Sequence, residues 1–277
     1  MIKKKRRGLW PAMALNLMVL LLCVIGWHAD ALAQETQIYS SENLPRPDTV
    51  WVFKPQKSTG DKKLPLLFLL HGYGGNYKQW HSIMNAQQYA DEYGFIIVCP
   101  DGLFSSWYLN SPAQPHLQFE RFFFDELMPD IRSKYPVDEK NIFISGLSMG
   151  GHGALYLFLK KPALFKSAGS TSGGVRLSDS FGKYGLGEVL GNPPADSPLW
   201  DDYSVIHQIA TLSDKNKPFI FDCGAGDPFY AANNALKAKC DSLHLQATYI
   251  SQPGGHNRAY WTQSIRQQMN FFKSHLN

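Results

Sequence analysis

One stretch decides the fold: Ile144-Ser145-Gly146-Leu147-Ser148-Met149-Gly150-Gly151-His152-Gly153, which contains a G-x-S-x-G motif centred on Ser148. A strand-like run at 141–145 precedes the motif, and an apolar run with the length of a helix follows it at 149–160. A sharp turn between a strand and a helix strains the central serine and exposes its Oγ, and the flanking glycines leave the room that a Cβ would fill. The stretch therefore predicts strand, turn and helix, with Ser148 as a candidate nucleophile.

The rest of the chain alternates in the same way. Short apolar runs occur at 50–53, 64–70, 95–99, 141–145, 165–168, 218–223 and 247–250, and helical candidates at 79–93, 118–135, 149–160, 228–242 and 258–275. Continuously apolar strands that alternate with helices are typical of a mostly parallel sheet covered on both faces. We therefore predict an α/β fold.

The first 33 residues have the three parts of a secretory signal peptide. A basic head at 1–7 precedes an apolar run at 12–27 and the small-residue exit Ala31-Leu32-Ala33. The apolar run is shorter than the roughly 20 residues of a spanning helix, so an uncleaved anchor is the weaker alternative. A lipoprotein modified at Cys23 is weaker still, because no small residue precedes that cysteine. We expect export to the periplasm or the medium, with 34–277 as a single domain.

The net charge of +4 belongs to this leader. It holds five of the 27 Lys and Arg residues and one of the 23 Asp and Glu residues, which leaves 22 of each in the mature chain. A neutral chain has no general attraction for nucleic acid or an anionic membrane. We expect neither as a partner, and no stable membrane association after cleavage; the oligomeric state is left open.

Three cysteines remain in the mature chain: Cys99, Cys223 and Cys240. The first two lie in apolar runs, which favours buried thiols, although one disulfide with unassigned pairing is open to an exported protein. No C-x-x-C motif or Cys/His cluster has the spacing of a zinc site, so we expect no structural metal.

A nucleophilic serine needs a base, and the base needs an orienting carboxylate. In α/β-hydrolases the acid and then the base follow the serine along the chain. His256 follows the last strand-like run in a glycine-bearing loop and is the predicted base, with His207 as its rival. Asp227 lies just beyond the run at 218–223 and is the predicted acid. Asp222 lies inside that run and is the alternative, which we interpret as a buried structural carboxylate.

Two backbone amides are the candidate donors for an oxyanion. The run at 64–70 feeds the glycine-rich turn His71-Gly72-Tyr73-Gly74-Gly75, as an oxyanion loop requires. We expect the N–H groups of Tyr73 and of Met149, the residue after the serine, to form the pair; the alternative is a plain turn. His71 itself is interpreted as structural.

One segment breaks the alternation. Residues 173–203 are rich in Gly, Pro, Ser and Asp and have no clear period, so we predict a lid-like loop, with a surface excursion as the alternative. Trp107 lies in the polar loop 101–111, where we expect it at the edge of a pocket.

These residues resemble the esterase D family of α/β-hydrolases, which includes S-formylglutathione hydrolases, feruloyl, acetylxylan and tributyrin esterases, and the mycolyltransferases. The segment 146–155 resembles the family's nucleophile signature, and the likeness runs from His71 to His256. It implies an α/β-hydrolase fold, a triad of Ser148, Asp227 and His256, and no metal or organic cofactor. The segment 100–112 is similar to one that borders the acyl site, which implies that Trp107 and Tyr108 bind substrate.

The resemblance implies a serine carboxylesterase, and the predicted signal peptide implies that it is secreted. Export argues against the S-formylglutathione hydrolase branch, and we expect acetyl or feruloyl esters of carbohydrates, or small short-chain acyl esters. An acyltransferase of the mycolyltransferase type and a non-catalytic binding protein on the same fold are the alternatives. The acyl preference and the physiological substrate stay open at this stage.

Overall fold

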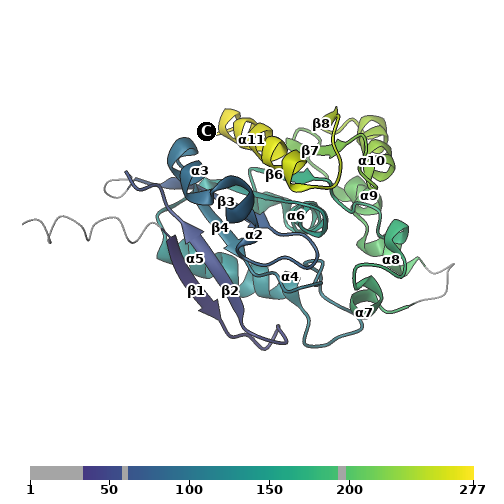
Figure 1. Ribbon diagram of the computed structural model, residues 1–277, viewed down its shortest axis with the longest axis horizontal. Coiled ribbons are helices and arrows are strands. Elements are labelled where there is room, and N and C mark those ends of the chain that lie inside the picture. Colours follow the sequence, from purple (N-terminus) through teal and green to yellow (C-terminus); the bar gives the residue numbers. More distant parts are fainter. Residues whose placement is uncertain (1–33, 58–61, 193–197) are drawn as a thin grey trace, which may run out of the picture.

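A computed structural model describes residues 34–57, 62–192 and 198–277. The described chain forms an eight-stranded sheet in the order β1-β2-β4-β3-β5-β6-β7-β8, with helices against both of its faces (Figure 1). This confirms the predicted α/β fold. The predicted signal peptide at 1–33 lies outside the described residues.

The sheet is antiparallel at one edge and parallel elsewhere. β1 pairs antiparallel with β2, and β2 with β4, whereas the remaining neighbours pair in parallel. The strands are β1 Gln34–Tyr39, β2 Asp48–Phe53, β3 Leu64–Leu70, β4 Ile96–Pro100, β5 Val137–Gly146, β6 Ser167–Thr171, β7 Phe219–Gly224 and β8 Ala247–Gln252. Carboxyl ends of parallel strands meet at one edge of a sheet, and this edge collects the candidate site residues.

The central strands are apolar on both faces because each face has its own core. In β3, Leu66, Phe68 and Leu70 contribute to one core, and Leu67 and Leu69 contribute to the other. Residues of α4 (Phe119–Phe122), α5 (Met128–Lys134), α6 (Met149–Lys160) and α10 (Tyr230–Ser242) complete the first core. Residues of α2 (Gln79–Met84), α3 (Ala86–Tyr93) and α11 (Arg258–Ser274) complete the second. Burial of this apolar surface is the main favourable term in folding.

The α-helices of the described chain are α2 Gln79–Met84, α3 Ala86–Tyr93, α4 Phe119–Phe122, α5 Met128–Lys134, α6 Met149–Lys160, α7 Leu186–Leu190, α8 Leu199–Tyr203, α9 Val205–Gln208, α10 Tyr230–Ser242 and α11 Arg258–Ser274. Each of the five predicted helical runs is helical in the structure, which also has the unpredicted short helices α7, α8 and α9. The helix expected at 79–93 is divided at Asn85, whose φ of 52° ends α2 and begins α3. The helix expected at 118–135 contains a π-helical turn, Phe123–Leu127, between α4 and α5.

Sequence patterns did not predict β1. Its side chains alternate between exposed and half-buried, none is buried, and the strand lies at the edge of the sheet. The lid-like segment 173–203 is more ordered than its composition indicates, because its described part holds the 3-10 turn Leu177–Ser180 and the helices α7 and α8.

The cysteines are buried and free. Cys99, Cys223 and Cys240 all carry unpaired thiols, so no disulfide joins any two of them. None of the helices within the described ranges has the length and hydrophobicity needed to cross a membrane.

The turn after β5 makes the sharpest steric prediction. A Cβ at Gly150 would lie 2.5 Å from the carbonyl oxygen of His71 and closer still to that of Leu70. These are backbone atoms that no rotamer change can move, so we expect Gly150→Ala to lower the free energy of unfolding by about 1–3 kcal/mol or more. Denaturant unfolding of both proteins measures the difference.

The matched control is Gly255→Ala. The nearest atom to a Cβ there is the side-chain nitrogen of Asn257, 3.4 Å away and an ordinary contact. The same exchange should change the free energy of unfolding by no more than about 0.5 kcal/mol. Equal losses in the two variants would contradict the steric argument.

Candidate active site

The turn between β5 and α6 presents Ser148 in a strained conformation. Its φ of 55° and ψ of −116° lie outside the helical and extended regions, as a nucleophile elbow requires. The Ser148 N–H donates to the Thr171 carbonyl over 2.9 Å, which fixes the turn to the end of β6. Ser148 is 9% exposed, so its hydroxyl opens to a narrow part of the surface.

His256 lies between Ser148 and Asp227. The loop after β8 carries His256, and its Nε2 is 2.9 Å from the Ser148 Oγ while its Nδ1 is 2.9 Å from the Asp227 Oδ2. A hydroxyl, an imidazole and a carboxylate in this order can pass a proton from the hydroxyl to the imidazole, which the carboxylate holds in one orientation. The structure therefore brings together the three side chains that the sequence predicted.

The rival histidine lies elsewhere. His207 belongs to α9, where its Nε2 is 3.3 Å from a carboxylate oxygen of Asp201 and both side chains are largely exposed. It makes no contact with Ser148.

The carboxylate of Asp227 is buried and well supported. Its Oδ1 accepts the Phe229 N–H over 2.9 Å, and the His256 imidazole donates to its Oδ2. The nearby Ser172 side chain also lowers the pKa of the carboxylate. Burial alone would raise the pKa of Asp227, but the hydrogen bond and charge of His256, together with the Phe229 N–H and the Ser172 side chain, outweigh it and lower the pKa below its ordinary value.

Asp222 has a different environment in the middle of β7. It is fully buried and accepts hydrogen bonds of 2.7 Å from Thr171, Ser264 and Gln268. Burial raises the pKa of Asp222, because its nearest donors are neutral. Its hydrogen bonds join β7 to β6 and to α11, as expected of a structural carboxylate.

Two aromatic rings and a serine hold His256 and Asp227 in place. The rings of Phe229 and Trp261 meet the imidazole edge-on at centroid distances of 5.3 and 5.1 Å. The indole N–H of Trp261 donates to the Ser172 Oγ over 3.2 Å. Ser172 itself has a φ of 51°. Sequence reasoning missed these three residues; the signal for Ser172 was its place directly after β6.

The loop after β3 is fixed beside the serine. A Cβ at Gly72 would lie 3.3 Å from the Ser148 Cβ, so the two turns touch. The Gly72 N–H donates to Gln79 over 2.8 Å, and the buried His71 imidazole lies between the carbonyls of Gly72 and Asp101. Burial lowers the pKa of His71 to about 4, which keeps the ring neutral and supports the structural interpretation.

The two candidate oxyanion donors flank this contact. Tyr73 follows Gly72 directly, and within the described ranges no protein atom accepts its N–H. Met149 is the first residue of α6, so its N–H is one of the first-turn amides that have no acceptor inside a helix.

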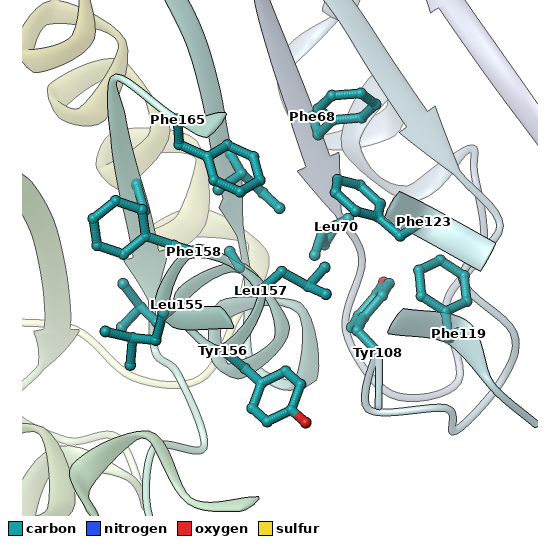
Figure 2. Close-up of a cluster of buried hydrophobic side chains, with 14 of the residues drawn as sticks. Phe68, Leu70, Tyr108, Phe119, Phe123, Leu155, Tyr156, Leu157, Phe158 and Phe165 are labelled. Carbon is teal, nitrogen blue, oxygen red and sulfur yellow. The ribbon is translucent and has the colours of Figure 1, made fainter. Parts of the chain in front are cut away.

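The prediction that Trp107 and Tyr108 bind substrate is wrong. Both side chains are buried, at 1% and 0% exposure, so neither has a face on which a ligand could lie. Figure 2 shows Tyr108 beside Phe119 within the apolar cluster around α6. The Tyr108 hydroxyl donates to the His71 carbonyl over 2.9 Å. This hydrogen bond holds the loop after β3 in place.

Trp107 supports the lid-like segment instead. Its indole N–H donates to the Tyr184 carbonyl over 3.0 Å, and its ring meets that of His152 edge-on. The polar composition of the loop concealed that two of its three aromatic residues, Trp107 and Tyr108, turn inward. Both have positive φ angles, 52° for Trp107 and 62° for Tyr108, a backbone conformation that a sequence pattern does not reveal.

Within the part of the chain that the structure describes, no three His, Cys, Asp or Glu side chains are grouped so that they could hold a metal ion. The groups that converge on Ser148 are an imidazole, a carboxylate and backbone amides. Such a set is suited to nucleophilic attack on an acyl carbon.

Comparisons with known proteins agree with this chemistry. A family model described as "Putative esterase" matches residues 41–272. An acetyl esterase from Caldicellulosiruptor saccharolyticus is 26% identical over 257 residues, 87% of this chain and 94% of that protein. An S-formylglutathione hydrolase structure from Agrobacterium tumefaciens has a TM-score of 0.77 at 22% identity and covers 88% of this chain and 95% of that one. A ferulic acid esterase structure has a TM-score of 0.74 at 22% identity, covering 88% and 98%. The chain belongs to this esterase family and is an α/β serine hydrolase that acts on carboxylic esters.

Proposed function

We propose that Ser148, His256 and Asp227 are the nucleophile, the base and the orienting acid of this esterase. The observation that carries the proposal is the continuous hydrogen-bonded path from the Ser148 Oγ through both ring nitrogens of His256 to the Asp227 carboxylate. Each of the three comes from the carboxyl end of a different parallel strand, where sites of this fold class lie.

The reaction proceeds in two steps through an acyl-enzyme. His256 Nε2 takes the Ser148 proton as Oγ attacks the ester carbonyl, and the same nitrogen then gives the proton to the departing alcohol. Water repeats the sequence on the acyl-serine and releases the acid. The N–H groups of Tyr73 and Met149 donate to the oxyanion, and the N-terminus of α6 adds a favourable dipole.

The lowered pKa of Asp227 suits its role. The carboxylate stays charged at neutral pH, so it stabilises the imidazolium that forms on His256 during each proton transfer. Its two oxygens are divided between the Nδ1 of His256 and the Phe229 N–H, which leaves the imidazole a single orientation.

We propose carbohydrate esters as the substrate class, with acetyl or feruloyl groups as the acyl part, and small short-chain acyl esters as the wider range. Relatives named acetyl esterase and ferulic acid esterase support this choice. The signal peptide predicted at 1–33 also supports it, because an exported enzyme meets polysaccharide fragments outside the cytoplasm. On this proposal residues 34–277 are the secreted catalytic domain.

A panel of esters tests the proposed function. Mature protein should hydrolyse acetyl, butyryl and feruloyl esters, and a fluorophosphonate should label Ser148. We expect Ser148→Ala to abolish labelling and turnover, and His256→Ala to reduce kcat by about 10³-fold or more. Mass spectrometry of the labelled peptide and a pH-stat assay measure both. Turnover retained by folded Ser148→Ala would exclude this nucleophile, and a wild type without turnover or label would favour a non-catalytic binding protein.

Asp222 in β7 and Asp227 in the loop after β7 allow a matched test of which aspartate is the orienting acid. Asp227→Asn should lower kcat by about 10³–10⁴-fold with the fold intact, because an amide cannot hold His256 in the productive orientation. Asp222→Asn should instead lower the free energy of unfolding by about 1–3 kcal/mol, because one buried donor loses its acceptor. Steady-state kinetics and denaturant unfolding on both variants separate the effects. The reverse ranking in kcat would assign the acid to Asp222.

Ser172 should tune the Asp227 carboxylate. Ser172→Ala removes the hydroxyl that lowers the pKa of Asp227, so this pKa should rise toward its ordinary value. Titration of the Asp227 carboxyl carbon by NMR measures the change. Ser170→Ala is the control, because the buried Ser170 Oγ has no hydrogen-bond partner in the described chain. An unchanged pKa in Ser172→Ala, or an equal rise in the control, would refute this role.

A further inference from the structure

Four aromatic side chains form a row that begins at the base and ends past the oxyanion loop. Phe229 meets His256 edge-on, Tyr184 lies 6.2 Å from Phe229, Tyr73 lies 5.6 Å from Tyr184, and Phe104 lies 4.9 Å from Tyr73, all between ring centroids. We call these four residues the aromatic row. Because its ends contact the two loops that flank Ser148, the row borders the mouth of the site.

The row is open to solvent. Phe104 is 57% exposed, Tyr73 39% and Tyr184 37%, whereas Phe229 beside His256 is buried. Exposed apolar side chains that lie together, unlike ones scattered singly, mark interaction sites such as ligand-binding grooves. The exposure therefore needs a functional reason.

The row is also pre-formed. The Trp107 indole holds the Tyr184 carbonyl, and the Gly74 N–H donates to the Phe104 carbonyl over 2.9 Å. A Cβ at Gly185 would lie 3.6 Å from the Tyr73 ring, so the lid-like segment packs directly against the loop after β3. A surface fixed in this way loses little conformational entropy when a ligand covers it.

Position and exposure together indicate which part of an ester the row receives. The departing alcohol must lie next to the Nε2 of His256 to receive its proton, and the row starts at Phe229 beside that ring. An aryl group would gain most from an enclosed pocket, since its stabilisation grows with the apolar area removed from water. A sugar ring can lay its C–H face on an open aromatic surface and keep its hydroxyls in water, with the phenols of Tyr73 and Tyr184 as partners.

We propose that the aromatic row is the subsite for the sugar ring of the alcohol, so the enzyme selects acylated sugars over ring-free esters. This inference rests on the proposed roles of Ser148 and His256. The inference assigns alcohol specificity to Phe104, Tyr73 and Tyr184. These residues take the place of Trp107 and Tyr108 as the proposed substrate-binding aromatic residues.

Three substrates separate the two sides of the ester. An acetylated xylo-oligosaccharide carries a ring on the alcohol, methyl ferulate carries one on the acyl group, and ethyl acetate carries none. Phe104→Ala and Tyr184→Ala should each lower kcat/KM for the first by about tenfold, the equivalent of one lost ring contact, and change the other two by less than about twofold. A pH-stat assay follows all three reactions and needs no chromogenic aryl leaving group, which could itself bind the aromatic row.

Phe181→Ala is the matched control. Phe181 is 53% exposed on the same lid-like segment, but its ring packs against Trp200, outside the row. It should leave all three kcat/KM values unchanged. A fall for methyl ferulate alone would assign the row to the acyl side, and equal falls for all three substrates would mean that the row only braces the site; either result overturns the proposal.

A binding measurement with a sugar that carries no ester tests the proposed subsite separately from the proposed nucleophile. Xylotriose, which has no ester, should bind wild type and Ser148→Ala equally in calorimetry, and its Kd should rise about tenfold in Tyr184→Ala. Failure of Ser148→Ala to lose turnover would refute the proposed nucleophile and leave the binding result standing. Absence of xylotriose binding to an active wild type would refute the row as a sugar subsite.

Discussion

The site depends on a close approach of backbones where β3, β5 and α6 meet. At Gly150 the space for a Cβ is already occupied by the carbonyls of Leu70 and His71, and the Leu147 N–H donates to the Leu70 carbonyl over 3.2 Å. The turn that carries Ser148 and the loop that carries Tyr73 are thus joined by main-chain atoms. Because neither turn can move without the other, the serine and the predicted oxyanion donor keep a fixed separation.

Most of this fold could be predicted from the sequence, for a physical reason. Strands buried on both faces are apolar throughout, so runs such as 64–70 and 218–223 stand out in the sequence and reappear as β3 and β7. The same reasoning fails at β1, because Gln34–Tyr39 pairs with one neighbour only and buries no side chain. It also fails at Asn85, where one left-handed residue divides the predicted helix into two.

The residues of the site also fall into two groups, those whose position the sequence could predict and those whose position it could not. Chain order and strand ends were enough to predict that Ser148, Asp227 and His256 lie together, because parallel strands end at one edge of the sheet. The direction of side chains in irregular loops could not be predicted from the sequence. Trp107 lies in a polar loop and was therefore predicted at the surface, whereas its ring turns inward at a position with a positive φ. The exposed aromatic rings near the site come from segments whose composition indicates only turns.

The contrast between Asp222 and Asp227 shows how the end of a strand changes the environment of a carboxylate. The two carboxylates are five residues apart and both are buried, yet the pKa of Asp222 is raised and that of Asp227 is lowered. Inside β7, Asp222 meets only neutral donors from packed elements, so burial dominates. Beyond the strand, Asp227 meets a free backbone N–H and an imidazole from the next loop, so partners dominate. A carboxylate on such a strand can orient an imidazole where the sheet ends, because loops from two strands converge there.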